Sequence, residues 1–257
     1  GKAHAAGTAT VTGDDVVGIK IEYQKADGSW TTNPSEITAT NVSDSKTVNI
    51  RVTSEKYNGE LTGTEELTIT KREVTLTSET AEKPYDGTPL TRPTVKVEGD
   101  GFVDGEVRDL RATGTITNVG RPVTNTIEYT GVESKFNADN YEIKKHEGTL
   151  RITKAGKVGL TVEGAERKYN GEPLSATKVE TSVTKGTTIS YSIDDGSTWT
   201  AEAPSITNAG TLKVTVKAEN PNYKTATSEY TLTITKREVT LTSETAEKPY
   251  DGTPLTR

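Results

Sequence analysis

Apolar residues along the chain alternate with polar ones in short runs. Ile19, Ile21 and Tyr23 form one such run, and turn-forming residues follow it at positions 26–29. A spacing of two places successive apolar side chains on one face of a β-strand, whereas an amphipathic helix needs spacings of three and four. No window of 11 or more residues keeps a helical period. The pattern therefore predicts an all-β chain.

The alternating runs are short, and turn signals separate them. Further runs are Val48, Ile50 and Val52, then Val95 and Val97, and then Val123, Ile127 and Tyr129. Short strands with a turn every 8–12 residues or so are typical of immunoglobulin-like β-sandwiches. A β-grasp unit is the alternative, and it requires a helix that the pattern does not provide.

An internal repeat organises the chain. Residues 67–92 and 232–257 both read LTITKREVTLTSETAEKPYDGTPLTR, at a shift of 232 − 67 = 165 residues. Repeats of this kind indicate an array of similar units. The second copy ends one unit at residue 236 and begins another at residue 237. We call residues 237–257 the tail.

Three segments precede the tail, and each ends on an Ile-Thr-Lys triplet. The first segment, 1–71, is a type A repeat whose opening strand is missing, and the second, 72–154, is a type B repeat. The third segment, 155–236, is again type A, and the tail supplies the opening strand and turn of a further type B repeat. In an alternative frame, 93–257 is one complete repeat of 165 residues.

The two type A segments can be matched residue by residue. Ile189 and Tyr191 match Ile21 and Tyr23, and Trp199 matches Trp30. The later apolar run is expected to match as Leu212, Val214 and Val216 with Val48, Ile50 and Val52.

Short links between the segments, without a Gly/Ser spacer, predict tandem sandwiches in an extended rod. The tail then lacks the rest of its repeat. Because unpaired strands invite strand addition, we expect the tail to pair either with the chain's own third segment or with a neighbouring chain.

Composition narrows the function classes. Hydrophobic residues make up 30% and aromatic residues 5% of the 257 residues, which suits several thin cores. The net charge of −6 argues against a nucleic-acid partner. No apolar run is long enough for membrane insertion. Without cysteine, disulfides and thiolate metal sites are excluded.

The turn Lys83-Pro84-Tyr85-Asp86-Gly87-Thr88-Pro89 recurs at 248–254, and 168–173 is a variant. This motif resembles the signature of YDG/MBG-type tandem repeats in bacterial cell-surface adhesin-like proteins. The resemblance covers nearly the whole chain, and in it Tyr85, Asp86, Gly87, Tyr250, Asp251 and Gly252 are structural motif residues. It implies a secreted, extracellular protein attached to the cell wall, in which such repeats form a stalk or bind mucus.

Four aromatic residues are candidates for stacking on glycans: Trp30, Trp199, Tyr85 and Tyr169. The competing interpretation is that they fill the small cores, since large apolar residues are scarce. The stretch Ser192–Trp199 matches the Asp-box pattern S-x-D-x-G-x-T-W of sialidase propellers, and a hairpin turn with the Trp packed beside it is the favoured interpretation.

No catalytic site or cofactor is predicted. The two histidines, His4 and His146, lie apart from any nucleophile and base constellation, so we expect no enzyme. Asp100, Asp104, Glu106 and Asp109 lie close in sequence, but their spacing is not that of a calcium-binding EF-hand loop, and a solvated loop without metal is expected.

The sequence therefore predicts a structural stalk segment of a bacterial surface adhesin, which spaces an adhesive tip from the cell wall. The alternative function is that the repeats themselves bind mucin or other host glycans, weakly and with avidity from copy number.

Overall fold

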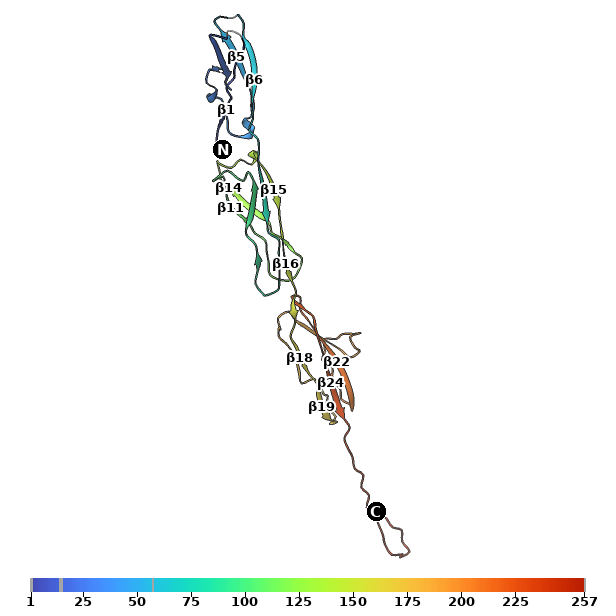
Figure 1. Ribbon diagram of the computed structural model, residues 1–257. Helices are drawn as coiled ribbons and strands as arrows, with labels where there is room; N and C mark the ends of the chain where they lie inside the picture. The colour runs from blue at the N-terminus through green and yellow to red at the C-terminus, as the bar shows by residue number, and fades with distance from the viewer. Residues whose placement is uncertain (1, 14–15, 57, 257) are drawn as a thin grey trace. The chain divides into compact units, whose positions relative to one another are not determined.

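The computed structural model describes residues 2–13, 16–56 and 58–256 (Figure 1). Among these residues the secondary structure is almost entirely β, with three 3₁₀ turns and no α-helix. The helix that a β-grasp unit requires is therefore absent from the described residues. The chain consists of tandem β-sandwich domains, which confirms the predicted fold class.

In the first segment a four-stranded sheet covers a small two-stranded one. The elements are β1 (His4–Ala5), β2 (Ile19–Gln24), β3 (Trp30–Thr31), η1 (Pro34–Glu36), β4 (Thr38–Ala39), η2 (Val42–Asp44), β5 (Lys46–Ser54) and β6 (Leu61–Leu67). The sheet order is β3-β2-β5-β6, and β1 pairs with β4. Tyr23, Val48 and Ile50 meet Ile37 and Ala39 between the two layers.

The second segment closes its core between β7 and the β11–β14 pair. The elements are β7 (Arg72–Ser78), β8 (Ala81–Pro84), β9 (Leu90–Thr91), β10 (Val95–Gly99), β11 (Val107–Ala112), β12 (Thr115–Ile116), β13 (Val123–Thr124), β14 (Ile127–Gly131), η3 (Ala138–Asn140), β15 (Tyr141–His146) and β16 (Thr149–Thr153). The sheets are β10-β7-β15, β13-β16-β8, β11-β14 and β12-β9. Val74 and Leu76 of β7 are fully buried against Ile127 and Tyr141. Each such burial contributes roughly 1.5–3 kcal/mol.

The third segment has the longest strands. The elements are β17 (Ala155–Lys157), β18 (Leu160–Glu163), β19 (Ala165–Lys168), β20 (Lys178–Thr181), β21 (Thr188–Ser192), β22 (Gly210–Glu219), β23 (Tyr223–Lys224) and β24 (Ala226–Thr235). The main sheet has the order β19-β24-β22-β21, and β18-β20 and β17-β23 are two-stranded. Leu160, Val162 and Val179 of β18 and β20 pack against Val214 and Leu232 of the main sheet.

The chain divides into two compact units. One comprises the chain up to residue 83 together with 87–152, and the other comprises 84–86 together with the chain from residue 153 onward. Residues 84–86 belong to the second unit because the Tyr85 backbone N–H donates to the carbonyl oxygen of Thr153 at 2.8 Å. The three-segment division remains a prediction.

The strand registers correct the expected match between the two type A segments. Tyr23 lies opposite Ile50, and Tyr191 lies opposite Val216. Ile50 therefore corresponds to Val216 and not to Val214. The expected match was wrong by two residues, because a run with period two can be shifted by two and keep all its apolar side chains on the same face.

The tail contains no strand among the residues that the structure describes (Figure 1, red end of the chain). Val239 and Leu241 are 92% and 96% exposed. The expected opening strand is therefore not formed, and neither is the expected pairing of residues 238–245 with the third segment. Pairing with a neighbouring chain stays a prediction.

Candidate functional site

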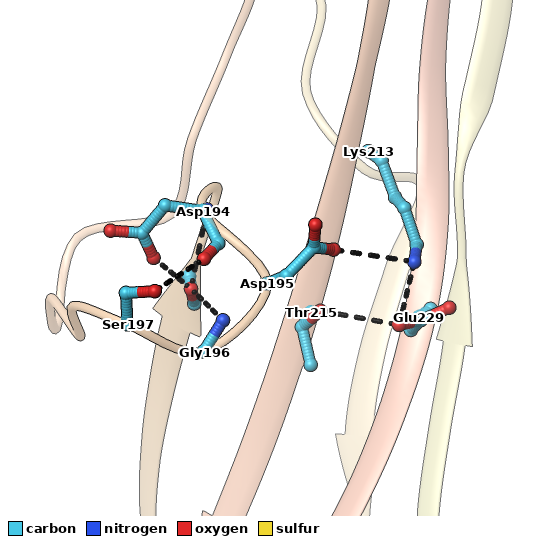
Figure 2. Close-up of polar contacts among 8 residues, drawn as sticks. Asp194, Asp195, Gly196, Ser197, Lys213, Thr215 and Glu229 are labelled. Carbon is cyan, nitrogen blue, oxygen red and sulfur yellow. Dashed lines mark hydrogen bonds and ion pairs between the residues drawn. The ribbon is translucent and has the colours of Figure 1, made fainter.

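The hairpin after β21 is built around the carboxylate of Asp194 (Figure 2). Ser192 Oγ donates to Oδ1 at 2.6 Å, and Thr198 donates from its backbone N to Oδ1 at 2.9 Å and from Oγ1 to Oδ2 at 2.6 Å. The hydrogen bond from Ser192, followed by those from Thr198, lowers the pKa of Asp194 to about 2. Both carboxylate oxygens are occupied within the hairpin, so this Asp is a structural residue, as the hairpin interpretation expects.

Glycine and a left-handed aspartate make the bend of this hairpin possible. Asp195 has φ of 52° and Gly196 has φ of 90°, and the Gly196 N–H donates to Ser192 Oγ at 2.8 Å. Ser197 Oγ donates to the carbonyl oxygen of Asp194 at 2.9 Å. Short polar side chains that bond to nearby backbone are typical of such turns.

Lys213 connects the hairpin to the sheet beneath it (Figure 2). Its Nζ lies 3.5 Å from Asp195 Oδ1 and 3.0 Å from Glu229 Oε1. The hydrogen bond to Glu229 raises the pKa of Lys213. All three side chains are more than half exposed, so solvent screens the pairs and they contribute little to stability.

Trp199 lies at the end of the hairpin and is 37% exposed. Its Nε1–H donates to the carbonyl oxygen of Gly196 at 3.1 Å, and Lys217 Nζ lies 4.4 Å from the ring centroid. The interpretation of this Trp as a core residue is therefore wrong. The ring is held by a backbone hydrogen bond and a cation–π contact, and it stays partly open to solvent.

Trp30 of the first segment is half-buried, and a cation lies over its ring, as Lys217 lies over the ring of Trp199. Arg51 Cζ lies 4.3 Å from the centroid of its ring. Arg51 Nε donates to Glu22 Oε2 at 2.9 Å, and Lys20 Nζ lies 2.7 Å from Glu22 Oε1. The hydrogen bonds from Lys20 and then Arg51 lower the pKa of Glu22.

Arg51 and Lys217 occupy the same position in the two type A segments. With Ile50 equivalent to Val216, the next residue on each strand is the cation beside the Trp. The sequence analysis missed this pairing because it used the shifted register. The equivalent Tyr23 and Tyr191 strands are the signal that would have found it.

A shallow groove of about 490 Å³ lies beside Trp30. Its polar lining includes Gln24, Asn49, Glu60, Thr62 and Thr64. Asn49 Nδ2 donates to Gln24 Oε1 at 2.8 Å. Amides and hydroxyls that both donate and accept, next to an aromatic ring, can bind the hydroxyls and the C–H face of a sugar.

The two tyrosine candidates have other environments. Tyr85 makes an edge-on contact with Tyr223, with ring centroids 5.5 Å apart. Tyr169 is 41% exposed, and its N–H donates to the carbonyl oxygen of Thr235 at 2.9 Å. Tyr85, Tyr169 and Trp199 thus have different neighbours within their unit, and we find no shared aromatic patch in its described part.

The YDG motif residues form a turn that a lysine closes. Lys83 Nζ donates to Thr88 Oγ1 at 2.6 Å, and in the tail Lys248 Nζ donates to Thr253 Oγ1 at 2.5 Å and to Asp251 Oδ1 at 2.8 Å. Gly87 and Gly252 have φ of 81° and 74°, which L side chains rarely adopt. Tyr250 is 97% exposed, so the turn forms with or without a contact for its tyrosine.

The acidic residues near position 104 do not converge. Glu106 is buried and accepts a hydrogen bond from Tyr141 Oη at 2.6 Å, while Asp100 Oδ2 accepts from the backbone N–H of Glu73 at 3.1 Å. Among the described residues, no group of three His, Cys, Asp or Glu side chains could hold a metal ion.

Across residues 2–13, 16–56 and 58–256, no helix is long and apolar enough to cross a membrane.

The sequence analysis did not predict two buried polar sites, Tyr141 with Glu106 and Asn125. Burial, followed by the hydrogen bond to Glu106, raises the pKa of Tyr141. Asn125 is fully buried, and its Nδ2 donates to the carbonyl oxygens of Glu79 and Arg92 at 3.1 and 2.8 Å. Both sites join loops of the second segment, and a lone polar residue in sequence gives no signal of such burial.

Comparisons with known proteins give a fold-level likeness. No protein-family model and no curated protein matches the chain. The protocadherin GammaB4 extracellular domain is 13% identical with a TM-score of 0.33, over 85% of this chain and 43% of that one. The chain thus spans less than half of that protocadherin.

Two further solved structures have lower TM-scores. Drosophila N-cadherin EC1-4 is 8% identical with a TM-score of 0.22, over 90% of this chain and 71% of that one. Three N-terminal domains of the bacteriophage RB49 outer capsid protein Hoc are 13% identical with a TM-score of 0.27, over 90% and 93% of the two chains.

Proposed function

We propose that the chain is a load-bearing stalk segment of an extracellular bacterial surface protein of the YDG/MBG repeat type. In this role it spaces an adhesive tip from the cell wall. The lysine-closed turn, repeated in sequence and in geometry at Lys83 and Lys248, supports the assignment to a repeat class.

The observation that carries this proposal is the parallel pairing of early and late strands within a segment. In the second segment β7 runs parallel to β15, from the Arg72–Tyr141 pair to the Thr77–His146 pair. In the third segment β19, the third strand of that segment, runs parallel to the last strand, β24, from Ala165–Leu232 to Lys168–Thr235. In both segments, a strand from the first part thus lies parallel to a strand from the end of the same segment.

Parallel pairing of these strands decides how a segment responds to tension. When the two ends of a segment are pulled apart, the early strand is drawn toward its N-terminal end and the late strand toward its C-terminal end. In a parallel pair these directions slide one strand along the other, so the ladder hydrogen bonds are loaded together. In an unzipping geometry they break one at a time.

Force spectroscopy on the full chain tests the stalk proposal. Handles at residues 72 and 146 load the β7–β15 ladder in shear, whereas handles at 79 and 146 peel the same ladder from one end. We expect a clearly higher unfolding force in the first geometry, because forced unfolding follows the unfolding barrier. Equal forces in the two geometries would contradict the proposal.

Glycan binding in the groove beside Trp30 is the second candidate function. The supporting observation is the convergence of one indole, two amides and two threonine hydroxyls on one sheet face. Binding by a single shallow groove is weak, and tandem copies raise it through avidity.

A mucin and glycan binding screen tests this second function. Trp30→Ala removes the stacking surface, and Trp199→Ala is the matched control, because Trp199 lies in the equivalent hairpin of the third segment. Binding that is lost only in the Trp30 variant supports the groove. Binding that both variants retain contradicts it.

A further inference from the structure

The groove beside Trp30 has one charged residue in its lining, Glu60. Glu60 is exposed, and its carboxylate forms no hydrogen bond or ion pair within the described part of the chain. None of the described residues that line the groove is a lysine, an arginine or a histidine. The groove therefore presents an uncompensated negative charge to whatever enters it.

The cations closest to the indole in the fold are engaged elsewhere. Arg51 contacts the ring of Trp30, but its Nε donates to Glu22 Oε2 at 2.9 Å, and Arg51 is not among the residues that line the groove. Lys20 Nζ lies 2.7 Å from the other carboxylate oxygen of Glu22. Both cations thus neutralise Glu22 and leave the charge of Glu60 unopposed.

The remaining polar atoms of the groove are mainly hydrogen-bond acceptors. Asn49 Nδ2 donates to Gln24 Oε1 at 2.8 Å, which leaves the side-chain carbonyl oxygen of Asn49 as an acceptor. The hydroxyls of Thr62 and Thr64 have no partner among the described residues, and a hydroxyl accepts as well as donates. The carboxylate of Glu60 only accepts. Such a set suits a ligand whose polar groups donate, as sugar hydroxyls do, whereas carboxylate and sulfate groups only accept.

The sheet face that holds the groove is also open in the third segment. By the registers of the β5–β6 and β22–β24 pairs, Thr227 and Glu229 are the equivalents of Thr62 and Thr64. Both are exposed, because β19 pairs with β24 only over 232–235 and lies beyond them. The open face is therefore a property of the four-stranded sheet of a type A segment, whether or not strands β17 to β19 accompany it.

The third segment nevertheless satisfies its own polar groups on this face. Lys213 Nζ lies 3.0 Å from Glu229 Oε1, and Thr215 Oγ1 donates to the same oxygen at 3.4 Å. Ser192, the equivalent of Gln24, donates to Asp194 Oδ1 at 2.6 Å. The polar groups that the first segment leaves open to a ligand are thus bonded to one another in the third, and its glutamate is paired.

Resting on the proposed glycan-binding function, we propose that the groove beside Trp30 binds an uncharged terminal hexose and that Glu60 excludes sialylated and sulfated glycans. The C–H face of the sugar stacks on the indole, and its hydroxyls donate to Glu60 and Asn49. A carboxylate or sulfate at the same place meets the charge of Glu60 with no cation to offset it. Two like unit charges about 4 Å apart weaken binding by about fivefold even with the dielectric constant of bulk water.

Binding of the full chain to three matched surfaces tests the proposal. The surfaces carry lactose, the same disaccharide with a terminal sialic acid, and the same disaccharide with a sulfate group, at equal density. In biolayer interferometry the wild type should bind lactose at least about fivefold more tightly than either anionic probe. Glu60→Gln should narrow this preference, and Glu60→Lys should reverse it.

Two further variants serve as controls. Glu133 is exposed in a loop of the second segment and does not line the groove, so Glu133→Lys makes the same change of net charge elsewhere and should keep the preference of the wild type. Trp30→Ala should remove binding to all three surfaces.

The outcomes separate a failure of this inference from a failure of glycan binding. Binding that depends on Trp30 but favours the anionic probes, or treats the three surfaces alike, would overturn the inference and leave glycan binding in place. The same holds if Glu60→Lys and Glu133→Lys shift the preference equally. A wild-type chain that binds none of the surfaces, or whose binding survives in Trp30→Ala, would overturn both.

Discussion

The two copies of the 26-residue stretch, 67–92 and 232–257, carry the same side chains in two environments. In the first copy Val74 and Leu76 are fully buried on the central strand of a sheet. In the second copy the equivalent Val239 and Leu241 are 92% and 96% exposed and belong to no strand. The difference shows that alternation makes a strand possible, whereas neighbouring strands make it form.

The turn at the end of the same stretch behaves differently. Lys248 closes its turn in the tail as Lys83 does in the second segment. The turn depends on bonds within about seven residues, while the strand depends on residues 95–146. Local and tertiary contributions are thus separated within one repeated sequence.

The largest effect is expected when the tail is followed by strands like those that flank β7. Appending a second copy of residues 93–154 after residue 257 supplies the equivalents of β10 and β15. Hydrogen exchange at Val239 and Leu241 should then slow from nearly unprotected to protection that reflects global stability, about 5–15 kcal/mol for a domain. An appended segment of the same composition in scrambled order is the control, and equal protection from it would contradict the comparison.

A matched pair of core substitutions should give the next largest difference. Leu76→Ala removes a fully buried side chain and should lower the free energy of unfolding of the second segment by about 2–5 kcal/mol. Leu241→Ala at the equivalent position should change it by less than about 0.5 kcal/mol. Denaturant unfolding measures both, and similar losses at the two positions would refute the difference in environment.

A buried hydroxyl should give a smaller difference. Ser78 Oγ donates to the carbonyl oxygen of Asn125 at 2.6 Å and accepts from the Gly148 N–H at 3.0 Å. Ser78→Ala leaves both groups without this partner and should cost about 1–3 kcal/mol. Ser243→Ala, its counterpart in the tail, should cost almost nothing. The same unfolding experiment decides between them.

The smallest effect concerns the turn in the tail. The hydrogen bond from Lys248, followed by those from Thr253, lowers the pKa of Asp251 below its ordinary value of 3.8. The interactions that lower this pKa stabilise the turn at pH values above 3.8, where the carboxylate is ionised. This stabilisation is lost as the pH falls through the pKa of the folded turn. Carboxyl titration by NMR should show the pKa of Asp251 rise in Lys248→Met, whereas Lys236→Met should leave it unchanged.

The alternating pattern predicted strands that form in the three segments, whereas in the tail it predicted a strand that does not form. Tyr23, Val48 and Ile50 lie in a core as their spacing indicates. It was insufficient for register, because a shift by two residues leaves the buried face unchanged, and so Val216 was paired with Val52 in place of Ile50. The equivalent positions of Arg51 and Lys217 beside the two indole rings follow from the correct register. The sequence analysis missed them because it used the shifted one.

The polar contacts of the candidate site and of the cores were only partly predictable from the sequence. The hairpin around Asp194 followed from a local motif, whose hydrogen bonds lie within six residues. The burial of Tyr141 against Glu106 joins residues 35 positions apart, which no local pattern reports. Sequence spacing therefore located the turns and could not locate the contacts between distant loops.

The placement of the two indoles gives the chain its own set of optical probes. Trp30 lies in the first segment and Trp199 in the third, each with a cation within 4.4 Å of its ring, and the chain has no other tryptophan. Trp30→Phe leaves an emission signal that reports the third segment alone, and Trp199→Phe leaves one that reports the first. The second segment, whose rings are Phe and Tyr, is silent under excitation selective for indole. The unfolding of each type A segment can therefore be followed separately in one unlabelled molecule.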